Sequence, residues 1–170
     1  MRNIKFVSHS EELQLIDELG DKLLGDGFNS SNSVIVTVST DYSSIVAQIL
    51  RHKLSYGEEI CDGFGVDVPY PDEMWDEKYV GELQKVFQTY GYLLEHKTPI
   101  LVEAGVIRGG NYHFLTNWMK AHFGSNLPIV TTSMFENVGS KFKSDYVSQY
   151  YDDTIEDLTF WWETDNKHWK

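Results

Sequence analysis

A chain of 170 residues with 41% hydrophobic and 14% aromatic content is long enough to bury one sizeable core, which predicts a single domain over residues 1–170. Its 26 acidic and 14 basic residues give a formal net charge of −12, and a field of this sign repels nucleic acid and anionic membranes. No apolar run approaches the roughly 20 residues of a membrane-spanning helix, the amino terminus lacks the apolar core of a signal peptide, and the single cysteine, Cys61, can form no internal disulfide. We therefore expect a cytoplasmic protein that binds neither nucleic acid nor a membrane.

The first third of the chain predicts a helix, a strand and a second helix. Ser8 and Glu11 have the spacing of a capping box, and apolar residues then recur at helical spacing as far as Gly25. Residues 33–39 form a β-branched run typical of a strand that is covered on both faces. An apolar stripe over residues 45–50 then predicts a helix that follows this strand after a short turn.

The rest of the chain continues this alternation after residues 58–77, a glycine-rich and acidic stretch that predicts no clear strand. The expected elements are a long helix over 78–96, a buried strand over 98–105, a helix after Gly110, a buried strand over 127–135 and an edge strand over 146–151. Strands and helices that alternate with short connections predict an α/β fold, with a mostly parallel, twisted sheet flanked by helices on both faces. We expect the strands that contain Ile35 and Leu101 to lie side by side at its centre.

The turn after the strand at 98–105 is the main candidate site. In an open parallel sheet, ligands bind beyond the carboxyl ends of the strands, where helix amino termini offer unpaired N–H groups. Gly109 and Gly110 have no Cβ, so their backbone can curl around an anion, and Arg108 could add a charged contact. Glu103 could accept hydrogen bonds from sugar hydroxyls or bind a divalent metal. On geometry alone, such a Gly-Gly pair is more often an ordinary strand-to-helix turn than an anion site, and neither GxGxxG nor GxxxxGK[ST] is present.

Residues 100–112, ILVEAGVIRGGNY, resemble the phosphoribosyl-diphosphate (PRPP) binding motif of type I phosphoribosyltransferases. The segments VSHSEELQLIDELGDKLL and VIVTVSTDYSSIVAQIL are similar to the leading helix, first strand and diphosphate loop of the bacterial purine, xanthine-guanine type members. SKFKSDYVSQYYDD resembles the base-binding segment of that group, and LTFWWE resembles its Phe-Pro-Trp-Glu ending, with Trp161 in place of proline. The resemblance thus spans nearly the whole chain.

The resemblance implies a single-domain phosphoribosyltransferase-like fold that binds PRPP or a nucleoside monophosphate, pairs as a homodimer, and uses Mg²⁺. It gives Glu103 a catalytic and metal-binding role, and it places a helical insertion, residues 78–97, where the family has a mobile loop. The remaining roles are phosphate binding for Arg108, Gly109, Gly110, Asn111 and Tyr112, diphosphate binding for the loop Ser39, Thr40, Asp41 and Tyr42, and base binding for Phe160, Trp161 and Trp162.

Three departures from the family pattern bear on activity. Ala104 replaces the second acid of the motif, Ile107 stands where purine enzymes often carry an acidic general-base candidate, and Asp41 stands in a diphosphate loop that lacks its usual basic residue. Two functions therefore stay open: purine phosphoribosyl transfer, and a catalytically impaired nucleotide-binding or regulatory module. A third possibility, an interaction protein that uses its acidic surface, predicts no affinity for any phosphorylated ribose.

Several other residues have plain structural interpretations. The aromatic ending could stack a base or could pack in the core or in a dimer interface, and Trp118 is a further candidate for such an interface. The dispersed acids between Asp62 and Glu77 could bind Mg²⁺, although such residues usually form a solvated surface. We expect Cys61 to be a small buried residue and Asp152 to lie in a turn.

Overall fold

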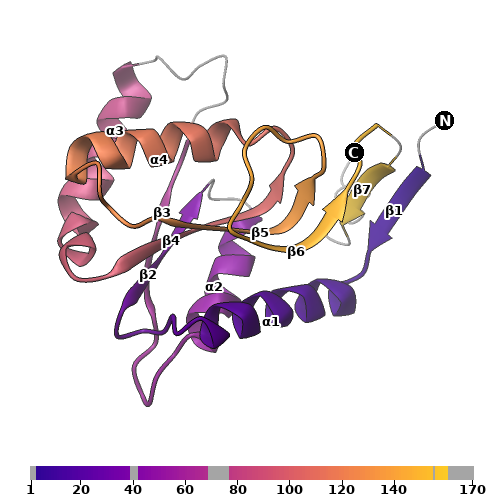
Figure 1. The fold of residues 1–170 in the computed structure, drawn as a ribbon, viewed down its shortest axis with the longest axis horizontal. Helices are drawn as coiled ribbons and strands as arrows, with labels where there is room; N and C mark the ends of the chain where they lie inside the picture. The colour runs from indigo at the N-terminus through magenta and orange to yellow at the C-terminus, as the bar shows by residue number, and fades with distance from the viewer. Residues whose placement is uncertain (1–2, 39–41, 69–76, 155, 161–170) are drawn as a thin grey trace, which may run out of the picture.

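A five-stranded, fully parallel sheet forms the centre of the fold (Figure 1). The computed structural model describes residues 3–38, 42–68, 77–154 and 156–160, with side chains from residue 80 onward in the helix that begins at Glu77. Within this part of the chain the strands lie in the order β3 (Asp62–Val66), β2 (Ser33–Val38), β4 (Thr98–Val106), β5 (Val130–Asn137) and β6 (Tyr146–Tyr151). Ile35 is paired with Ile100 and Val36 with Leu101, so the predicted central pair of strands is confirmed.

Helices cover both faces of this sheet, as the alternating pattern predicted (Figure 1). Helices α1 (His9–Gly25) and α2 (Ser43–Lys53) pack on one face, where Leu19 and Leu50 share a buried cluster with Val102 of β4. Helix α3 (Glu77–Tyr90), the 3₁₀ helix η1 (Gly91–Glu95) and α4 (Gly110–Phe123) cover the other face. All six residues of β2 are buried because this strand is covered on both sides.

The start of α1 has Ser8 as its N-cap, as predicted. The Ser8 hydroxyl accepts a hydrogen bond from the Glu11 N–H at 3.2 Å, and the helix ends at Gly25 as expected. None of the helices in the described ranges is both long and apolar enough to cross a membrane.

Two predicted elements have different bounds in the structure. The helix predicted over 78–96 changes to a 3₁₀ turn at Gly91, where a side chain would meet the Phe123 ring at 3.1 Å from its Cβ. The strand predicted over 127–135 begins only at Val130, since Pro128 has no N–H for the ladder, and it continues to Asn137.

A small second sheet joins the two ends of the described chain and was not predicted. Strand β1 (Asn3–Val7) pairs in parallel with β7 (Glu156–Phe160), and the two lie side by side in Figure 1. Phe160 packs edge to face on Phe135 of β5, with the ring centroids 5.5 Å apart. This contact fastens the small sheet to the main core.

Candidate functional site

The segments that carry the candidate residues meet at the carboxyl ends of β2, β4 and β5. The buried Ser43 hydroxyl at the start of α2 accepts a hydrogen bond from the Ala104 N–H at 3.0 Å, so the β2–α2 connection is fastened to β4. On the other side, the Asn137 side-chain amide donates to the Ile107 carbonyl at 3.2 Å and joins the end of β5 to the β4–α4 turn. This edge is where ligands bind in parallel α/β sheets.

The amino terminus of α4 has free donors. Gly109 precedes the helix with φ +74°, and it has no side chain to cap the first turn. The Gly109 carbonyl accepts the first helical hydrogen bond, from the His113 N–H. In the part of the chain that the structure describes, the N–H groups of Gly110, Asn111 and Tyr112 donate to no acceptor. Three free donors and the positive end of the helix dipole favour an anion here.

The segment that follows β5 packs against this turn. A Cβ added to Gly109 would overlap the Cβ of Phe142 and approach the Ser140 hydroxyl at 3.1 Å. Phe142 also contacts the ring of Tyr112, with the centroids 5.3 Å apart. The Tyr112 side chain is fully buried, and its hydroxyl donates to the Thr132 carbonyl, so only the backbone of this residue is available to a ligand.

Glu103 lies in the carboxyl-terminal half of β4, three residues before its end, is partly buried, and reaches the first turn of α4. Asn111 donates its side-chain N–H to the Glu103 carboxylate at 2.9 Å. Burial raises the pKa of Glu103 to about 7, and the hydrogen bond from Asn111 opposes this rise only in part. The carboxyl group therefore changes its charge near neutral pH, beside the predicted phosphate loop.

The raised pKa makes Glu103 a source of pH-dependent stability. A folded-state pKa above the ordinary 4.5 means that folding favours the neutral carboxyl group. The contribution of this group to the free energy of unfolding is therefore fully present below pH 4.5 and is lost as the pH rises through 7. A change of this size corresponds to an upper limit of about 3 kcal/mol. We expect Glu103→Gln, which keeps the oxygen that faces Asn111, to raise the free energy of unfolding by about 1–3 kcal/mol at pH 8 and to change it little at pH 4.5.

Urea denaturation of both proteins at the two pH values measures this difference. Glu18→Gln is the matched control, because the exposed Glu18 also accepts a side-chain amide hydrogen bond, from Gln14 at 2.9 Å. An equal effect of Glu103→Gln at both pH values would show that burial of the charge does not govern stability at this position.

Ala104 stands at the position of the second acid of the motif, and its side chain lies on the opposite face of β4 from Glu103. The Ala104 side chain is 7% exposed and belongs to the buried cluster under α1 and α2, whereas Glu103 faces Asn111 of α4. Among the described residues there is no group of three or more His, Cys, Asp or Glu residues that could hold a metal ion. Glu103 alone could supply one oxygen ligand to Mg²⁺, which commonly takes its other ligands from water and substrate phosphates.

Two charged residues, Glu136 in β5 and Lys143 in the segment that follows this strand, were not predicted from the sequence. Glu136 is fully buried, accepts a hydrogen bond from the Ser144 N–H at 2.8 Å, and forms an ion pair with Lys143 at 3.3 Å. The Lys143 ammonium group also donates to the Val138 carbonyl at 3.1 Å, and its side chain is about half exposed. A single carboxylate within a run of otherwise uncharged residues, TTSMFEN, was the available signal. Lys143 lies in the segment that resembles the family's base-binding region.

The other predicted site residues are placed as follows. Arg108 is exposed beside the turn, and Tyr42, 39% exposed, precedes α2. Phe160 is half-buried against Phe135, so packing alone accounts for its position. Five residues lie outside the described ranges: Ser39, Thr40, Asp41, Trp161 and Trp162.

The structural interpretations of Cys61 and Asp152 are confirmed. Cys61 is fully buried, and desolvation raises the pKa of its thiol to about 11, which keeps it protonated. Asp152 accepts hydrogen bonds from the N–H and the hydroxyl of Thr154, the pattern of an Asx turn.

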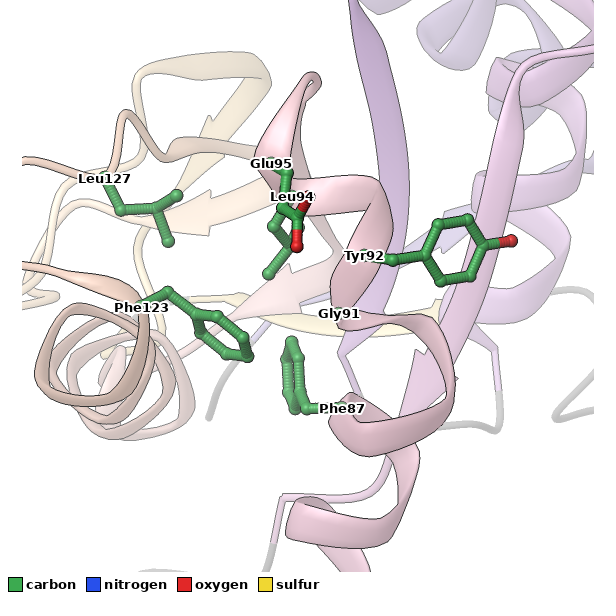
Figure 2. A pocket seen from close by; sticks show the side chains of 7 residues that line it. All are labelled: Phe87, Gly91, Tyr92, Leu94, Glu95, Phe123 and Leu127. Carbon is green, nitrogen blue, oxygen red and sulfur yellow. The ribbon is translucent and has the colours of Figure 1, made fainter.

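A separate apolar pocket lies at the far end of α4 (Figure 2). Its lining residues are Phe87, Gly91, Tyr92, Leu94, Glu95, Phe123 and Leu127. The rings of Phe87 and Phe123 lie next to each other in its wall, with centroids 5.4 Å apart. The pocket includes none of the predicted site residues, and Phe123 and Gly110 are the two ends of the 14-residue helix α4, so the pocket is distinct from the candidate site.

Comparisons with solved structures assign the fold. A purine phosphoribosyltransferase from Pyrococcus horikoshii superposes with a TM-score of 0.64 at 16% identity, and the match covers 94% of each chain. The xanthine-guanine-hypoxanthine phosphoribosyltransferase of Helicobacter pylori gives 0.63 at 15% identity over 98% of each chain. A hypothetical protein from Neisseria gonorrhoeae with bound ppGpp gives 0.68 at 12% identity over 99% of this chain and 96% of that one. No protein-family model and no curated sequence matches the chain significantly.

These matches define the class of fold. The chain has the type I phosphoribosyltransferase fold over almost its whole length, in the form seen in purine phosphoribosyltransferases. Identities of 12–16% establish the fold and leave the activity to be argued from the site itself.

Proposed function

We propose that this protein binds a ribose-5-phosphate moiety, as PRPP or as a nucleoside monophosphate, at the carboxyl ends of β2, β4 and β5. The observation that carries the proposal is the amino terminus of α4, where three N–H groups have no acceptor among the described residues and burial raises the pKa of the nearby Glu103 to about 7. Free donors at a helix amino terminus stabilise a phosphate, and Glu103 with Asn111 can hydrogen-bond the ribose hydroxyls. The matching folds of purine phosphoribosyltransferases support this assignment.

A thermal-shift screen tests the proposal. PRPP, GMP, AMP and ribose 5-phosphate, each with and without Mg²⁺, are added to the full chain at millimolar concentration. A ligand that binds only the native state raises the unfolding temperature, because it adds to the free energy of unfolding. The addition is about 2.7 kcal/mol when the ligand is present at one hundred times its dissociation constant. No shift with any of the four would contradict the proposal and would favour an interaction protein.

Gly110→Val is expected to remove this binding, because a branched side chain at the first residue of α4 blocks the approach of a phosphate to the free N–H groups. Calorimetry with GMP or PRPP measures the effect, and we expect a loss of at least about tenfold in affinity. Gly25→Val is the control, since a Cβ at Gly25 meets no atom within 4 Å. Unchanged affinity in a folded Gly110→Val protein would place the phosphate elsewhere.

A second candidate function is a regulatory module that binds a nucleotide without transferring its phosphoribosyl group. Two observations favour it: the motif carries the single acid Glu103, and Ala104 faces the core instead of the site. The Neisseria gonorrhoeae protein of the same fold was solved with ppGpp, a guanine nucleotide rich in phosphate. We therefore include ppGpp in the screen, where a shift larger than that of GMP would favour this second function.

The proposal extends to metal, assembly and location. Mg²⁺ would bind with the phosphorylated ligand, through one oxygen of Glu103 and the phosphates, so we expect it to increase the thermal shift given by PRPP more than that given by ribose 5-phosphate.

We also propose a cytoplasmic homodimer that buries part of the aromatic surface, including Trp118. Sedimentation at micromolar concentration would test the dimer, and a purely monomeric protein would contradict it.

A further inference from the structure

The pocket at the carboxyl end of α4 has an aromatic wall (Figure 2). Its volume is about 210 Å³, which is below the roughly 300–1,000 Å³ of pockets that hold drug-sized ligands. Phe87 is buried and is held by ring contacts with Phe64 and Trp118, at centroid distances of 5.5 and 5.0 Å. Phe123 is 37% exposed, so its ring is accessible to a ligand. The pocket therefore suits a small molecule that is attracted by an aromatic ring.

Glu95 adds a negative charge to this pocket. Its exposed side chain carries the only charge among the described residues that line the pocket. In the described ranges no hydrogen bond or ion pair joins its carboxylate to another residue. Lys97, the nearest lysine along the chain, is held instead by Asp62 at 2.8 Å and by the Ser30 carbonyl at 2.7 Å. The charge of Glu95 is thus left for a ligand.

The carboxyl terminus of α4 contributes a potential of the same sign. Phe123 is the last residue of this helix, and the carbonyl groups of residues 121–123 accept no hydrogen bond from the described part of the chain. Free carbonyl groups and the negative end of the helix dipole favour a cation beside the last turn. The basic residues of this turn are Lys120 and His122, and neither forms an ion pair with Glu95.

We propose that this pocket binds a small organic ammonium ion, with its charge beside the Phe123 ring and the Glu95 carboxylate. The aromatic ring, the carboxylate and the helix terminus all attract positive charge. A neutral ligand would leave the carboxylate without a partner, and an anion would be repelled by it. The net charge of −12 also attracts cations to the protein as a whole. The ammonium site lies at the opposite end of α4 from the proposed phosphate loop and does not depend on it.

The experiment compares choline with neohexyl alcohol, in which a carbon atom replaces the nitrogen of choline and removes its charge. Both are titrated into the isotope-labelled full chain at low ionic strength, and binding is followed by NMR. We expect millimolar choline to shift the backbone amide signals of Gly91 and Leu127, which line the pocket. Neohexyl alcohol should bind at least about fivefold more weakly, because it has the same shape without the charge.

Two variants separate the contributions of charge and ring. Glu95→Gln removes the charge at nearly constant shape, and we expect it to weaken choline binding by about three- to tenfold without changing the affinity for neohexyl alcohol. Phe123→Leu keeps an apolar side chain without the ring and should weaken choline binding by about fivefold. Glu18→Gln is the matched control for lost charge, since Glu18 is exposed on α1, and it should leave choline binding unchanged.

Three results would each overturn the ammonium site: no shift of the pocket signals with choline, equal affinity for choline and neohexyl alcohol, or unchanged choline affinity in Glu95→Gln. The last result remains decisive if Phe123→Leu fails to fold, because the exposed Glu95 has no contact in the described ranges that supports the fold. GMP binding is measured separately on the parent, so failure of the ammonium site is distinguished from failure of the phosphate site.

Discussion

Replacing Gly109 with alanine is expected to lower the free energy of unfolding by about 2–4 kcal/mol, the sum of a left-handed backbone cost and an overpacking cost. Gly109 has φ +74°, a conformation that a side chain disfavours. The added Cβ would overlap the Cβ of Phe142 and also crowd the Ser140 hydroxyl. For a domain of this size the transition temperature should fall by roughly 5–15 °C. Thermal and urea denaturation measure the change.

Gly105→Ala is the matched control for this experiment. Gly105 lies four residues earlier in β4, its φ is not positive, and no atom lies within 4 Å of an added Cβ. We expect the control to change stability by less than about 1 kcal/mol. Similar losses of unfolding free energy in Gly109→Ala and Gly105→Ala would show that the segment after β5 does not pack tightly on the turn before α4. A large loss confined to Gly109 would assign this glycine to folding and leave Gly110 as the one available to a phosphate.

The local patterns predicted the central part of the fold well. Residues 33–38 and 98–106 carry apolar side chains on both faces, and only a central strand of a parallel sheet buries both. The Ser8–Glu11 capping box was equally informative, because its hydrogen bond forms within four residues. In each of these cases the interaction that fixes the structure is encoded locally.

The parts that were missed depend on contacts between distant segments. Strand β1 is paired with β7, some 150 residues later, and the pattern of either alone gives no sign of a partner. The ion pair of Glu136 with Lys143 was missed for a related reason, because a carboxylate at the end of a strand normally indicates exposure. Here the Ser144 N–H and the Lys143 ammonium group make burial acceptable.

In the candidate site, too, the features set by chain order were predicted and those set by contacts between distant segments were not. The sequence correctly placed Glu103 and the glycine pair at the end of a central strand, since chain order alone decides this. It could not show that Asn111 turns toward Glu103 or that Tyr112 is buried, because side-chain direction depends on the segment after β5 that packs on this turn. Chain order therefore predicted where these residues lie in the fold better than which way their side chains point.

We expect the purified protein to transfer phosphoribosyl groups to guanine, xanthine or hypoxanthine at a rate of only about 10⁻³ per second or less. Phosphoribosyl transfer requires stabilisation of a cationic ribose and a departing diphosphate, and each lost electrostatic contact costs on the order of 10²-fold in rate. Two acidic positions of the motif are occupied by Ala104, which is buried in the core, and by the exposed Ile107. Two such losses reduce a typical rate of about 10 per second by roughly 10⁴-fold.

Diphosphate release from PRPP with each base, in the presence of Mg²⁺, measures this rate, and Glu103→Gln gives the background. Because binding and transfer are separate properties, GMP affinity is determined on the same preparation, so that an inactive protein that binds GMP is distinguished from a misfolded one. Release at about one per second or faster would show that Glu103 and the backbone of the α4 turn suffice for transfer. Slow release together with GMP binding would identify the site as one that binds a nucleotide without transferring its phosphoribosyl group, as the single acid Glu103 of the motif favours.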